Sequence, residues 1–201
     1  MTFIHRFDPA TGPDVRTALV LHGTGGDENS LVPFSQALLP GAAILSPRGR
    51  VSEAGAPRFF RRFAEGVFDY DSIREEADAL ADFVREASET YGFDPERVVA
   101  IGYSNGANAA WSTLLRHPQV AAELVLFRPM VTLEDEKPDL TGKRAFVATG
   151  RDDMMVPLSN AERLVAQMRV LGMTVDHLVQ DAGHALTRAE IDAAALWLGG
   201  A

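Results

Sequence analysis

The stretch that most constrains the fold covers residues 98–108, Val-Val-Ala-Ile-Gly-Tyr-Ser-Asn-Gly-Ala-Asn. A short apolar run, typical of a buried strand, leads into Gly-x-Ser-x-Gly and then into an alanine-rich segment typical of a helix. This order predicts a nucleophile elbow, a sharp strand-to-helix turn that exposes the hydroxyl of Ser104. Gly102 and Gly106 agree with it, because side chains there would collide where strand and helix approach each other. Gly-x-Ser-x-Gly alone often marks only a loop, so the flanking elements carry the prediction.

Apolar runs and helical patterns alternate along the rest of the chain. Strands are expected at residues 3–7, 17–21, 43–46, 98–103, 123–127, 144–149 and 173–179, and helices at 31–39, 73–91, 105–117, 159–172 and 187–198. Capping boxes are expected at Ser72 with Glu75, Ser159 with Glu162 and Thr187 with Glu190. This alternation predicts one α/β domain over residues 1–201, with a mostly parallel sheet and helices on both faces. Together with the elbow, it resembles an α/β-hydrolase fold. No gap between strands is long enough for a separate cap domain.

Composition narrows the function classes. Apolar residues make up 46% and charged residues 23% of 201 residues, as in ordinary globular proteins. The net charge of −9 disfavours nucleic acid as a partner. The lack of cysteine excludes disulfides, thiolate metal sites and a cysteine nucleophile. Because the N-terminus has no apolar signal core and no run reaches membrane-spanning length, we expect a cytoplasmic location and no membrane partner.

A serine nucleophile needs a histidine base and a carboxylate that orients it. In α/β-hydrolase folds these residues follow the serine in the order acid, then histidine, each on a loop after a strand. Asp153 and His184 fit this order and placement, with Asp152 as the local competitor of Asp153. Asp153 alone is equally well explained as a turn cap before a proline. The other histidines fit less well, and His22 is interpreted as structural.

The negative charge that develops during acyl transfer needs two hydrogen-bond donors. We expect the N–H groups of Asn105, at the N-terminus of the elbow helix, and of Thr24, in the glycine-rich loop of residues 22–27. That loop does not match a phosphate cradle, because it lacks the Lys-Ser/Thr pair of a P-loop and the third spaced glycine of a dinucleotide fingerprint.

These motifs together resemble the phospholipase/carboxylesterase family of α/β-hydrolases, which includes acyl-protein thioesterases. The resemblance rests on residues 21–27, 102–106, 150–157 and 183–184, and is closest to the bacterial MhqD-like branch through residues 57–69 and 102–108. It covers essentially the whole chain. It implies a serine hydrolase of carboxylic esters, no metal or organic cofactor, and often a homodimer. Thr149-Gly150 stands where many relatives have His-Gly, which should not affect the triad.

One segment, Arg-Phe-Phe-Arg-Arg-Phe at residues 58–63, is unusual in an acidic chain. Its structural interpretation pairs the arginines with surface carboxylates and buries the phenylalanines. Its functional interpretation places it beside Ser104, with Arg61 binding a carboxylate of the substrate and Phe60 and Met155 as apolar walls. An enzyme of this kind would prefer esters that carry a second, negatively charged group.

The sequence thus predicts a cytoplasmic carboxylesterase with Ser104 as nucleophile, His184 as base and Asp153 as its orienting acid. A thioesterase or lysophospholipase would use the same residues on another acyl substrate. A non-catalytic ligand-binding protein on a hydrolase scaffold is the alternative from another class, although such proteins usually lose a triad residue. No cofactor or metal is expected.

Overall fold

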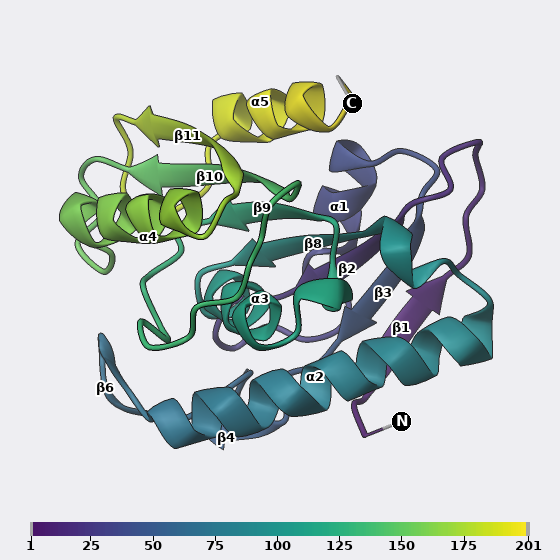
Figure 1. Ribbon diagram of the computed structural model, residues 1–201, viewed down its shortest axis with the longest axis horizontal. Helices are drawn as coiled ribbons and strands as arrows, with labels where there is room; N and C mark the ends of the chain where they lie inside the picture. The colour runs from purple at the N-terminus through teal and green to yellow at the C-terminus, as the bar shows by residue number, and fades with distance from the viewer. Residues whose placement is uncertain (1, 200–201) are drawn as a thin grey trace.

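The computed structural model describes residues 2–199, and its centre is a seven-stranded sheet (Figure 1). The strands of this sheet are β1 (His5–Asp8), β2 (Thr17–Leu21), β3 (Ala43–Pro47), β8 (Val98–Tyr103), β9 (Glu123–Phe127), β10 (Arg144–Gly150) and β11 (Thr174–Gln180). They lie in the order β1-β3-β2-β8-β9-β10-β11. Only β1, at one edge, runs antiparallel to its neighbour. The predicted mostly parallel sheet is therefore confirmed.

The central strands are buried on both faces, which is why they appear in the sequence as continuous apolar runs. Successive side chains of a strand point to opposite faces. In β2, Leu19 and Leu21 join one hydrophobic cluster, whereas Ala18 and Val20 join a second cluster on the other side of the sheet. The sheet thus separates two cores, each of which needs a covering layer of helices.

Helices supply both layers (Figure 1). They are α1 (Val32–Leu38), α2 (Tyr70–Tyr91), α3 (Asn105–Arg116), α4 (Leu158–Val170) and α5 (Arg188–Gly199), with short 3₁₀ helices at Pro95–Arg97 and Pro118–Val120. Buried side chains of α2, α3 and α4 pack in the first cluster, and those of α1 and α5 pack in the second. The helices therefore lie on both faces, as expected, and no separate cap is present among the described residues.

The helix starts differ partly from the expected capping boxes. At α2 the cap is Asp69, whose carboxylate accepts the N–H of Ser72, so the Ser72–Glu75 box is wrong. The Ser159–Glu162 box is also wrong, because α4 begins after Pro157 without a side-chain cap. The box at α5 is confirmed: the Thr187 N–H donates to Glu190 Oε2 over 2.8 Å, and the Glu190 N–H donates to Thr187 Oγ1 over 3.3 Å.

Residues 48–70 form two small hairpins that the sequence did not predict. β4 (Val51–Glu53) pairs with β5 (Ala56–Arg58), and β6 (Arg62–Ala64) pairs with β7 (Val67–Phe68). Strands of two or three residues are too short to show an alternating pattern, which explains why no period was visible. These hairpins lie beside the first turns of α2 (Figure 1).

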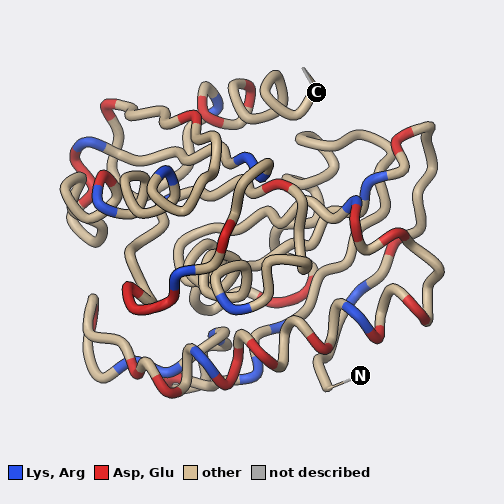
Figure 2. The backbone as a smooth tube through the Cα atoms, in the orientation of Figure 1, with Lys and Arg blue, Asp and Glu red and all other residues tan. Residues whose placement is uncertain are grey.

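Charged residues of both signs lie along the outer side of α2, the longest helix (Figure 2). Some of them form salt bridges along the helix, such as Arg85 Nη2 with Asp82 Oδ1 at 3.0 Å. Within residues 2–199, no helix combines the length and the apolar character needed to cross a bilayer.

Candidate active site

Ser104 lies at the turn between β8 and α3, in the left-handed region at φ 52°. Its N–H donates to the carbonyl of Phe127, the last residue of the neighbouring strand β9, over 2.8 Å. A Cβ at Gly102 would lie 2.6 Å from the backbone of α3, and one at Gly106 would overlap the carbonyl of Leu21. The two glycines thus permit the close approach of strand and helix, and the strained serine is the feature expected of a nucleophile elbow.

The structure brings the three predicted triad residues into one hydrogen-bonded chain. Ser104 Oγ lies 3.1 Å from His184 Nε2, and His184 Nδ1 lies 2.8 Å from Asp153 Oδ2. The second carboxylate oxygen of Asp153 accepts the N–H groups of Met155 at 2.8 Å and Val156 at 3.0 Å. Because a carboxylate only accepts hydrogen bonds, His184 carries its proton on Nδ1 and leaves Nε2 free to accept the serine proton.

Asp152, the competitor of Asp153, has a different position. Its side chain is exposed, and its backbone N–H donates to the carbonyl of Ala182 over 3.0 Å. The Asp153 side chain is almost completely buried, at 1% exposure, and faces His184. The geometry therefore favours Asp153 over Asp152 as the partner of the imidazole.

Thr24 and Asn105, the predicted oxyanion donors, both line the pocket that contains Ser104. Asn105 is the first residue of α3, so its N–H has no acceptor within the helix. The Asn105 side-chain oxygen accepts the N–H of Phe59 over 2.8 Å, and Arg58 Nη1 donates to Thr24 Oγ1 over 2.6 Å. Both candidate donors are thus anchored by the segment that precedes the β6–β7 hairpin.

His22 has the structural position that the sequence suggested. It is buried, its Nε2 accepts the N–H of Gly49 over 2.9 Å, and its Nδ1 lies 2.7 Å from the carbonyl of Gly23. The proton therefore lies on Nδ1. Burial lowers the pKa of His22 below its ordinary value, so this side chain is kept neutral.

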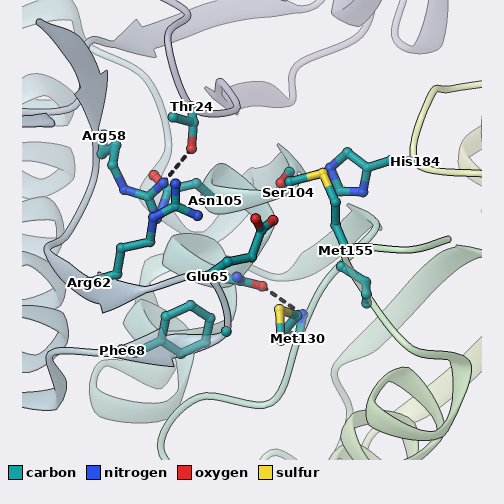
Figure 3. Close-up of a pocket in the computed structure, with 13 residues that line it drawn as sticks. Thr24, Arg58, Arg62, Glu65, Phe68, Ser104, Asn105, Met130, Met155 and His184 are labelled. Carbon is teal, nitrogen blue, oxygen red and sulfur yellow. Dashed lines mark hydrogen bonds between the residues drawn. The ribbon is translucent and has the colours of Figure 1, made fainter. Parts of the chain in front are cut away.

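A pocket opens beside Ser104 (Figure 3). Its charged lining consists of Arg58, Arg62 and Glu65, and its apolar lining includes Phe68, Met130 and Met155. Figure 3 shows the two arginines on the side away from His184, with Glu65 between them and Met155. The pocket thus presents two cations and one anion close to the serine.

The expected positions of Arg61 and Phe60 at this pocket are wrong. Arg61 lies outside it, where its Nε donates to Asp69 over 3.0 Å, and its side chain is 53% exposed. Phe60 is buried in the core against α2. The structural interpretation of the segment holds for these two residues, whereas Met155 lines the pocket as expected.

Arg58 and Arg62 are among the lining residues that sequence reasoning missed, although it singled out their segment. Arg58 is buried and Arg62 is one-fifth exposed, and both lie within 3.2 Å of Glu53 in β4. Their direction depends on the register of the two hairpins, which the sequence pattern did not reveal. Among residues 2–199 no group of three or more His, Asp or Glu side chains is arranged to hold a metal ion.

The chain is similar to a known protein family, to a curated protein and to several solved structures. The profile of the Dienelactone hydrolase family matches residues 56–195. A protein of Bacillus subtilis (strain 168) described as putative hydrolase MhqD is 39% identical over 194 residues, 96% of each chain. The Bacillus cereus carboxylesterase structure aligns with a TM-score of 0.95 and 37% identity, covering 97% of this chain and 92% of that one. The structure of YahD with malic acid aligns with a TM-score of 0.90 and 35% identity, covering 97% of each chain.

Proposed function

The chain belongs to the dienelactone hydrolase family, and from this membership we propose that it is a carboxylesterase with Ser104 as its nucleophile. The hydrolase class itself follows from the family and from the likeness to a carboxylesterase structure and to an MhqD-like hydrolase, as the motifs indicated. The observation that carries the finer proposal is the chain of hydrogen bonds from Ser104 through His184 to Asp153.

In the proposed reaction, Ser104 Oγ attacks the ester carbonyl while His184 Nε2 takes its proton. The N–H groups of Thr24 and Asn105 stabilise the oxyanion of the tetrahedral intermediate. His184 then gives the proton to the leaving alkoxide, and the acyl group remains on Ser104.

Water completes the reaction. It gives a proton to His184 and attacks the acyl carbon, and His184 returns that proton to Ser104 as the acid leaves. Asp153 holds the imidazole in the required tautomer and stabilises the imidazolium in both halves. The two backbone N–H groups that bind the other oxygen of Asp153 support this role, because they prevent the carboxylate from rotating.

A thioesterase or lysophospholipase acting on a long acyl chain would use the same residues, and the pocket lining supports the esterase over this alternative. Two arginines and a glutamate line it, and burying such side chains under a long alkyl chain would cost free energy. The lining therefore favours a short or polar acyl group. A non-catalytic binding protein is less well supported, because the serine, the base and the acid lie within hydrogen-bond reach of one another.

The test is to label the purified protein with a fluorophosphonate probe and to measure hydrolysis of p-nitrophenyl esters of increasing acyl length, with matching thioesters. We expect labelling, and turnover that is highest for short esters. Ser104→Ala should abolish both, whereas Ser52→Ala, an exposed serine outside the pocket, should change neither. Labelling that survives in the Ser104→Ala variant would contradict the proposal. The homodimer, the cytoplasmic location and the lack of nucleic-acid or membrane partners stay predictions.

A further inference from the structure

Arg128 is a completely buried arginine at the centre of the catalytic end of the sheet. It directly follows β9, its side chain is 0% exposed, and its backbone adopts φ 56°. Its N–H donates to the carbonyl of Ala148 in β10 over 2.9 Å. Both the left-handed backbone and the burial of a charge cost free energy, so Arg128 needs many hydrogen bonds to compensate for them.

The guanidinium of Arg128 binds the backbone on both sides of His184. Its Nε donates to the carbonyl of Gly183 over 3.0 Å, and its Nη2 donates to the carbonyl of Ala185 over 2.9 Å. The carbonyl of His184 itself accepts the hydroxyl of Tyr103 over 3.2 Å. Three consecutive carbonyls around the imidazole therefore each have a side-chain donor.

Glu190 neutralises Arg128 and connects it to the start of α5. Its carboxylate accepts Nη1 and Nη2 of Arg128, the latter over 3.1 Å, and is itself fully buried. The same carboxylate accepts the N–H and the hydroxyl of Thr187, each over 2.8 Å. Burial alone would raise the pKa of Glu190, but the hydrogen bonds from Arg128 and Thr187 outweigh it and lower the pKa below its usual value. Glu190 is therefore ionised and anchors the segment of residues 183–187 at its far end.

Arg128 also lies next to the acid of the triad. Its Nε is 3.8 Å from Asp153 Oδ2, the oxygen that faces His184 Nδ1. Without Glu190, the charge of Arg128 would compete with the imidazolium for this oxygen. With Glu190 paired to it, Arg128 leaves Asp153 to His184.

We propose that Arg128, neutralised by Glu190, is a positioning residue that holds His184 in line between Ser104 and Asp153 through the carbonyls of Gly183 and Ala185. The inference rests on the proposed function, in which His184 is the base. An imidazole displaced by about 1 Å slows proton transfer on the order of 10²-fold without changing substrate binding.

The first test is Arg128→Lys, which keeps the charge but cannot reach both carbonyls and Glu190 with a single nitrogen. We expect kcat for a short p-nitrophenyl ester to fall at least about tenfold per folded molecule, with KM within about twofold. Val98→Ala is the control, since Val98 is buried at the opposite end of β8 and its loss lowers stability without touching the site. It should lower the melting temperature and leave kcat unchanged.

A second variant separates positioning from stability in case Arg128→Lys folds poorly. Arg128→Met with Glu190→Leu replaces the buried pair by apolar groups, a change that often leaves folding stability intact. The carbonyls of Gly183 and Ala185 still lose their donors, so we expect a folded protein with a strongly reduced kcat. A double variant with wild-type kcat would overturn the proposal.

The third test is the pH profile of Glu190→Gln, which leaves the charge of Arg128 uncompensated. The charged and titratable groups around His184 are Asp153, Arg128, Glu190 and Tyr103, with Arg58, Arg62 and Glu65 across the pocket. The uncompensated cation should disfavour a positively charged imidazole beside it and so move the acid limb of kcat/KM to lower pH.

These outcomes distinguish the two proposals. Wild-type protein without esterase activity, or Ser104→Ala with full activity, would overturn the proposed function and this inference together. If the wild-type protein is active, the inference alone would be overturned by an Arg128→Lys variant that loses activity only in proportion to its unfolded fraction, as we expect for Val98→Ala. An acid limb unchanged in Glu190→Gln would do the same.

Discussion

Ser104 Oγ and His184 Nε2 lie 3.1 Å apart although 80 residues separate them in the chain. The parallel sheet explains this proximity, because the carboxyl ends of its strands lie at one edge. Ser104 follows β8, Asp153 follows β10 and His184 follows β11. Since β8, β9, β10 and β11 are adjacent in the sheet, their following loops converge on one site. The fold therefore brings the candidate nucleophile and base together although they are far apart in the sequence.

Asp153→Asn should lower kcat by a factor on the order of 10⁴. The amide that replaces the carboxylate can donate to His184 Nδ1 and thereby stabilise the wrong tautomer. Steady-state kinetics on a short ester will measure the loss. Asp152→Asn is the matched control and should retain activity, because its side chain is exposed. If the Asp152 variant is the inactive one, the assignment of the acid is wrong.

The pH dependence of turnover should follow the candidate base. Only a neutral imidazole can accept the serine proton, so kcat/KM should rise between about pH 5 and pH 8. Initial rates between pH 5 and 8 on a neutral ester will measure this limb. A flat profile would argue against a histidine base or against chemistry as the slow step.

Arg62→Ala should discriminate between esters of different charge. Arg62 lines the pocket, and loss of its guanidinium should raise KM for an ester with a second carboxylate by about tenfold, with little change for a neutral ester of equal size. Arg61→Ala provides the control, since Arg61 pairs with Asp69 outside the pocket. Equal changes of KM for both esters would exclude Arg62 from substrate binding.

Gly106→Ala should destabilise the fold by about 3 kcal/mol or more, because its Cβ would overlap the carbonyl of Leu21 in β2. Urea unfolding will measure the loss. Gly199→Ala, at the end of α5, adds a Cβ with no heavy atom within 4 Å and should leave the free energy of unfolding unchanged or slightly higher. A stable Gly106→Ala protein would contradict the close approach of α3 and β2.

His22 should contribute to the pH dependence of stability. Its pKa in the folded state is lowered by burial, so the unfolded chain binds its proton first as the pH falls. The contribution is therefore complete above about pH 6.5 and is lost below it, by up to about 1.4 kcal/mol per pH unit. Unfolding free energies of wild type and His22→Gln between pH 7.5 and 5 should differ in slope.

Local sequence patterns were sufficient to predict the elbow and most of the helices and strands. The apolar run at residues 98–103 and the glycines around Ser104 predicted a strand, a turn and a helix, and all three are present. The capping boxes were less reliable, because Asp69 caps α2 in place of Ser72. Several polar residues near a helix start can each act as a cap, and the path of the preceding chain selects among them.

The sequence by itself determined the parallel α/β sheet and the candidates Ser104, Asp153 and His184. Hydrophobic periodicity, glycine spacing and the order of loops after strands are properties of short stretches of chain. Only the tertiary structure decided that Arg58 and Arg62, and not Arg61, face the pocket, because two hairpins with strands of only two or three residues set those directions. It also decided the role of Arg128, whose contact with the carbonyl of Gly183 spans 55 residues. A contact of this kind arises from packing between distant elements, and no local pattern encodes it.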